Sequence, residues 1–303
     1  MKHVPTTLKT TSVFLAIVLS QSALIGRVDG ASVSADAFVG EGNQRFSRGL
    51  GFDFSTTPLE VVKADGSSSH DLSEAGGSGV LDFDATAMAT ASYNTLRASA
   101  SGTITNTYFD ENYNFEANTG VPTAYFSQGN ARFSQTLQYG GTANNYISTY
   151  ILRLTGSISG NGRAAVSIRL THASQPAQSW FFREAGTFDL TIFSQAYVHG
   201  AFPQEFQLSI NTLYSFDMFS FQDGSNASGG ADFGSTLEVV GIDLRDEMGN
   251  LQPQGTITSD SGQEFAIVAV PEPSSVALLV FAITGVGIAS YRRKKRSSLQ
   301  RFA

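Results

Sequence analysis

Acidic and amide side chains gather at two points of the chain where they could bind a metal ion or share a proton. Asp82 and Asp84 lie two residues apart in "VLDFDA", so on a strand both carboxylates would point to one face. The stretch "DLRDEMGN" supplies a second group of oxygen ligands around a glycine turn: Asp243, Asp246, Glu247 and Asn250. Oxygen ligands of this kind suit Ca²⁺.

The patterns around these residues favour simpler interpretations. Leu81 and Phe83 take the opposite face from the two aspartates, which favours solvated carboxylates over a paired acid–base site. The spacing within 243–250 is not that of an EF-hand loop, so a hydrophilic hairpin turn competes with a calcium site. We keep Ca²⁺ as a hypothesis and predict no other cofactor.

Aromatic residues next to polar groups suggest a third chemistry, the binding of sugars. Trp180 stands in "SWFFRE", and Tyr108 and Tyr113 stand in the acidic stretch "TNTYFDENYNFEANTG". Aromatic faces beside polar groups can hold a glycan. Trp180 could equally pack in a phenylalanine-rich core, and the two tyrosines could belong to a plain exposed loop.

No catalytic motif accompanies these candidates. The chain has no cysteine, no Gly-x-Ser-x-Gly elbow and no phosphate-binding loop. Its body contains three histidines without metal-site spacing, which we expect at the surface or as capping residues: His70, His172 and His199. We predict that the protein is not an enzyme. A polysaccharide hydrolase needs only two carboxylates at a suitable separation, so a site drawn from Glu184, Asp189 and Glu205 stays an alternative.

Charge is low and unevenly distributed. Of the 303 residues 41% are hydrophobic and 15% are charged. Residues 31–270 contain 24 acidic and 10 basic side chains, an excess of 14 negative charges. Phosphate backbones would be repelled by such a body, so we predict no nucleic-acid partner. Without cysteine, the fold must be held by its core alone.

The elements that would position these residues are strands. Apolar residues alternate with polar ones in many short segments, of which "ARFSQTLQY" at 131–139 is the clearest. Glycine, asparagine, aspartate and serine separate the segments. We predict an all-β fold, an antiparallel β-sandwich with jelly-roll-like topology, in which residues 31–269 form one extracellular domain.

Both ends of the chain are predicted to be targeting segments. Lys2 and Lys9 precede the apolar run at 12–26 and a small-residue exit, so residues 1–30 read as a signal peptide with a signal helix. Near the other end, the motif "VPEPS" at 270–274 precedes an apolar stretch at 275–291, predicted to be a transmembrane helix. The basic tail at 292–303 is predicted to be cytoplasmic.

Residues 270–303 resemble the PEP-CTERM sorting signal of exosortase substrates. The resemblance is carried by Pro271, Glu272, Pro273, Arg292, Arg293, Lys294, Lys295 and Arg296 around the apolar stretch. The stretches 91–102 and 227–262 are similar to parts of a β-sandwich domain found in many such proteins. The resemblance implies export through the Sec translocon, an inner-membrane intermediate and cleavage by exosortase near Pro-Glu-Pro.

A structural or interaction role at the cell surface or in the extracellular matrix follows as the functional prediction. Exopolysaccharide is the expected surrounding of such proteins. A carbohydrate-binding jelly roll is the first alternative, and a polysaccharide-modifying hydrolase is the second.

Overall fold

The computed structural model describes residues 30–42, 47–71, 79–105, 124–141, 143–160, 163–173, 175–217 and 226–270. Within these ranges the chain forms fourteen β-strands, and no helix there is long and apolar enough to cross a membrane. Three parts of the chain lie outside the described residues: residues 1–29 of the predicted signal peptide, the region 106–123 with Tyr108 and Tyr113, and everything from Pro271 onward.

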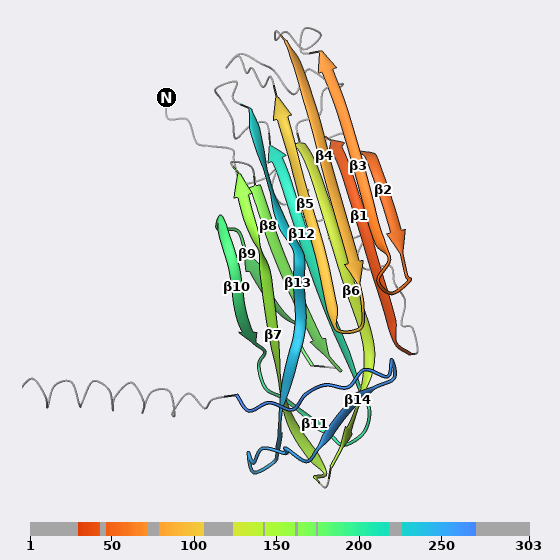
Figure 1. Ribbon diagram of the computed structural model, residues 1–303, viewed down its shortest axis with the longest axis vertical. Coiled ribbons are helices and arrows are strands. Elements are labelled where there is room, and N and C mark those ends of the chain that lie inside the picture. Colours follow the sequence, from red (N-terminus) through yellow and green to blue (C-terminus); the bar gives the residue numbers. More distant parts are fainter. Residues whose placement is uncertain are drawn as a thin grey trace, which may run out of the picture.

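The described strands form two seven-stranded sheets (Figure 1). Sheet A contains, in spatial order, β2 (Ser47–Ser55), β1 (Ser32–Gly42), β6 (Ala124–Gly140), β12 (Gln204–Asp217), β8 (Arg163–His172) and β9 (Gln178–Phe182), with β14 (Thr256–Ser259) paired to β6. Sheet B contains β10 (Gly186–Phe193), β7 (Asn145–Gly160), β13 (Ala227–Asp246), β5 (Thr95–Thr105), β4 (Val80–Ala91) and β3 (Val61–Asp71), with β11 (Tyr197–Gly200) paired to β7.

Every pairing between these strands is antiparallel, so the prediction of an all-β antiparallel fold is confirmed. Long strands run along the long axis of the molecule, with β11 and β14 at one end (Figure 1). The strands form because their side chains alternate between a buried and a more exposed face, as in β4 and β5. The inner faces of the two sheets pack against each other as one hydrophobic core.

Small inner side chains let the backbones of the two sheets approach closely between β4, β5 and β6. Alanines line the inner faces of β4 and β5, among them Ala87 and Ala100, each at most 1% exposed. Opposite them on β6 lies Gly129, where an added Cβ would stand 2.3 Å from the backbone oxygen of Met88. The alanine and serine alternation therefore has a structural purpose, because alanine faces the other sheet and serine or threonine faces outward.

This close approach predicts that Ala100→Val destabilises the fold, whereas Ser101→Val does not. Ala100 is buried between the sheets, and its neighbour Ser101 is exposed on the outer face of the same strand. Adding two methyl groups to a filled core costs about 1–3 kcal/mol. The midpoint of urea unfolding measures both variants. Equal urea midpoints for the two variants would show that the core between the sheets has space for the larger side chain.

Candidate functional site

The last described segment of the chain adds to the edge of sheet B. Strand β13 pairs with β5 only as far as Glu238, beyond which that edge of β13 is available. The Ile242 amide donates to the Ala266 carbonyl at 2.9 Å, and the Val268 amide donates to the Ile242 carbonyl at 3.0 Å. A parallel bridge joins Ile242 and Ile267. The chain is thus held on the sandwich up to the residue before Pro271.

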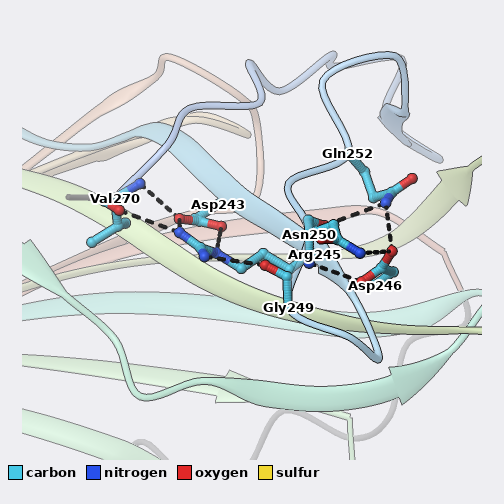
Figure 2. A network of polar contacts seen from close by, with 7 residues as sticks. All are labelled: Asp243, Arg245, Asp246, Gly249, Asn250, Gln252 and Val270. Carbon is cyan, nitrogen blue, oxygen red and sulfur yellow. Dashed lines mark hydrogen bonds and ion pairs between the residues drawn. The ribbon is translucent and has the colours of Figure 1, made fainter. Parts of the chain in front are cut away.

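A buried ion pair fixes the end of this segment (Figure 2). The Asp243 carboxylate, 3% exposed, receives hydrogen bonds from Arg245 Nε at 2.9 Å and Nη2 at 3.1 Å. It also accepts the Val270 amide at 2.7 Å, while Arg245 Nη2 donates to the Val270 carbonyl at 3.3 Å. Both backbone groups of Val270 are therefore bound by this ion pair. We call these three residues the Val270 clamp.

Two features of the sequence make the Val270 clamp possible. Asp243 and Arg245 are two residues apart on β13, so they lie on the same face of the strand. Gly241 leaves space for the docked segment, because a Cβ there would stand 2.0 Å from a methyl group of Val268. Any larger residue at this position would push the segment away.

The structure does not bring together the four residues considered for Ca²⁺. Asp243 belongs to the clamp, whereas Asp246 organises the following turn and accepts the amides of Met248 and Asn250, both at 2.9 Å. The side-chain amides of Asn250 and Gln252 also donate to Asp246 (Figure 2). Hydrogen bonds from Asn250, above all, lower the pKa of Asp246.

Glu247 lies apart from this turn network and accepts the side-chain amide of Asn145. Within the described ranges, no three histidine, aspartate or glutamate side chains stand close enough together to hold a metal ion. The stretch 243–250 therefore works as a turn and a clamp in this structure, with its oxygens engaged by donors of the protein itself.

Asp82 and Asp84 lie on the outer face of sheet B, opposite the buried Leu81 and Phe83, as the alternation predicts. They line an open depression of about 430 Å³ together with Phe83 and with residues of β3 and β5, namely Ser67, Ser68, Ser69, Thr103 and Thr105. Cross-strand pairing places Ser67 next to Asp84 and Ser69 next to Asp82. The depression is open to solvent, and its lining is both polar and apolar.

Trp180 occupies the edge strand β9 of sheet A and turns toward the other sheet. Its partly buried ring packs against the hydrophobic core, together with Phe182 and Phe188. The ring on the outer face of β9 is that of Phe181, which is 52% exposed and carries the Arg183 guanidinium at 4.3 Å from its centroid. The alternation along β9 therefore presents the phenylalanine, not the tryptophan, to solvent.

The three carboxylates considered for a hydrolase do not converge. Asp189 lies on the outer face of sheet B, where it pairs with Arg153 at 3.1 Å. Glu205 is exposed on sheet A, and Glu184 follows strand β9. Another carboxylate, Glu41, is 1% exposed and accepts Ser68 Oγ at 2.6 Å and His70 Nε2 at 2.9 Å. Because that serine bonds to the carboxylate rather than to the histidine, this cluster joins β1 to β3 and does not activate a nucleophile.

The expectation of surface histidines is wrong for His172 and His199, which are buried between the sheets. His172 is 0% exposed, and its Nδ1 lies 2.6 Å from the Tyr150 hydroxyl, which also lies 3.1 Å from the Tyr139 hydroxyl. His199 Nδ1 lies 2.9 Å from the Gly200 carbonyl, so it must donate there. His199 Nε2 then accepts the Ser148 hydroxyl at 2.7 Å.

We call this group the histidine–tyrosine cluster: Tyr139, Ser148, Tyr150, His172, Tyr197 and His199. A signal for it exists in the sequence, because counting by two from Val166 along β8 places His172 on the core face. Burial, and then the nearby His199, lower the pKa of His172 to about 3. Burial raises the pKa of Tyr139 to about 12. The cluster is therefore uncharged at neutral pH.

Comparisons with protein-family models, with curated proteins and with solved structures found no match for this chain. The class of protein is thus defined by the fold and the clamp alone: an all-β protein of two antiparallel sheets that holds its chain up to Val270.

The clamp predicts that Asp243→Asn destabilises the body. Breaking a buried ion pair leaves a buried charge without its partner. We expect the free energy of unfolding to fall by roughly 3 kcal/mol. This is the lower end of the range for such pairs, because Arg245 keeps some contact with water. Asp189→Asn is the matched control, because it breaks an exposed pair with Arg153 and should change little. Urea unfolding compares the two. Similar losses for both variants would contradict a special role of the clamp.

The histidine–tyrosine cluster predicts acid sensitivity. The unfolded chain protonates His172 near its ordinary pKa of 6.5, whereas the folded protein resists protonation until about pH 3. Stability should therefore fall as the pH drops from about 6.5 toward 3. His172→Gln removes this titration, so its unfolding midpoint should depend less on pH over that interval. An unchanged pH dependence in the variant would show that other groups cause the acid sensitivity.

Proposed function

We propose that this chain is an exported protein of the cell surface or extracellular matrix, sorted by exosortase through the tail that begins at Pro271. The observation that carries the proposal is the Val270 clamp. Val270 is fixed through both of its backbone groups, and Pro271-Glu272-Pro273 follows directly. The last described residue of the folded body is thus also the first residue of the motif.

The chemistry of the motif fits a processing enzyme. Proline has no amide hydrogen and biases the preceding residue toward extended conformations, which a protease-like enzyme can bind. The clamp keeps the edge of sheet B from being pulled into such an enzyme. A cut beyond Val270 would leave every described hydrogen bond of the body intact.

The body itself is proposed to act as a structural or interaction component. Its strands hold a rigid sandwich without disulfides, since the chain has no cysteine. The domain limits of 31–269, the jelly-roll-like topology and the passage through the inner membrane stay part of this proposal.

Intact mass spectrometry of the protein from the medium and from the envelope of its native cells tests the sorting role. Wild-type body should begin near Ala31 or Asp36 and end near Pro271. Replacing Pro271, Glu272 and Pro273 by alanine should leave the tail attached. Pro253→Ala, in a turn of the body, is the control and should be processed like the wild type.

A wild-type mass that retains residues 274–303 in every fraction would contradict sorting by exosortase. It would indicate a protein that keeps its tail. Normal processing of the triple alanine variant would show that the motif is not what the enzyme recognises.

A further inference from the structure

Two arginines stand side by side on the outer face of sheet A without an ion pair. Arg132 on β6 and Arg169 on β8 both lie opposite Ser209 of β12, the strand between them. Two strand spacings separate their Cα atoms by about 9.6 Å. That distance is comparable to the length of two linked sugar rings.

Most other cations of the described body are paired with a carboxylate. The ion pairs are Arg48–Glu41, Lys63–Asp65, Arg153–Asp189 and Arg245–Asp243. Neither Arg132 nor Arg169 forms an ion pair with a described residue. Burial, and then the positive charge of Arg169, lower the pKa of Arg132, so these two like charges repel each other across the face. An anion placed between them would relieve this repulsion.

The neighbouring row of the same face is built from hydrogen-bonding side chains. The strand register places one residue of each strand in this row. From β2 across to β9 they are Phe54, Asp36, Asn130, Asn211, Ser167 and Phe181. The two rings at the ends are 47% and 52% exposed. Amide and hydroxyl groups suit sugar hydroxyls, and exposed rings suit the apolar faces of sugars.

We propose that this outer face of sheet A, which we call the arginine face, binds an acidic polysaccharide through carboxylate groups carried on its sugar rings. The planar guanidinium fork of Arg169 matches a carboxylate with two parallel hydrogen bonds. Arg132 donates from Nε to the Gln207 side-chain oxygen at 2.9 Å, so it would offer the ligand its remaining N–H groups. A nucleic acid fits less well, because its dense phosphates would meet a body with an excess of 14 negative charges. A polysaccharide spaces its charges more widely and brings many hydroxyls.

Two carboxylates on the same face limit the affinity. Asp36 accepts the Asn130 side-chain amide at 2.9 Å, and Glu205 lies near Arg132 and attracts it. Removing the negative charge of Asp36 should therefore strengthen binding, whereas removing either arginine should weaken it. This role is independent of how the tail is processed, so its failure would leave the sorting role untouched.

Binding of the full chain, purified in a non-ionic detergent, to immobilised polygalacturonate tests the arginine face. Arg132→Gln and Arg169→Gln should each weaken binding about tenfold, and Asp36→Asn should strengthen it. Arg97→Gln is the matched control, because Arg97 is an exposed arginine without an ion pair to a described residue, on the outer face of the other sheet. Circular dichroism checks that each variant is folded.

Loss of binding in the two arginine-face variants, with Arg97→Gln unchanged, would support the proposal. Absent binding to polygalacturonate, or an equal loss in Arg97→Gln, would overturn it. Binding to dextran sulfate alone would also overturn it, since that would mean attraction to dense sulfate charge. Equal binding to neutral dextran would show that the carboxylates contribute nothing.

Discussion

Two antiparallel sheets bury their inner faces against each other, and no disulfide helps to hold them together. This packing positions every other feature of the molecule. Alanine and glycine in the middle let the backbones of β4, β5 and β6 approach closely. Larger aromatic side chains fill the end near β11, where the histidine–tyrosine cluster joins the sheets through hydrogen bonds. The outer faces are then left for solvent and partners.

The edge of sheet B shows how one constraint leads to the next. Because β5 begins only at Thr95, β13 keeps backbone groups available beyond Glu238, and the segment 266–268 satisfies part of them. The buried Asp243 and Arg245 then fix the following Val270. Asp243, which the sequence offered as a candidate metal ligand, thus serves together with Arg245 as the attachment point of the last described residues.

Period-2 alternation was enough to predict the strands and the outward position of Asp82 and Asp84, since both depend on nearest neighbours along one strand. The same alternation along β8 also places His172 on the inner face, but the polarity of histidine favoured a position at the surface. The role of Asp243 could not be predicted, because its partner Val270 lies 27 residues further along the chain. The arginine face depends on three strands far apart in sequence, so only the register of the sheet brings Arg132 and Arg169 together.

The folded body holds its chain up to Val270, immediately before the Pro-Glu-Pro motif. Amide hydrogen exchange of the full chain tests this most directly. The amides of Val268 and Val270 should exchange as slowly as those of β13, because each is bound to the sandwich. Exchange of both amides at the rate of an unfolded peptide would contradict it, since the clamp would then not exist in solution.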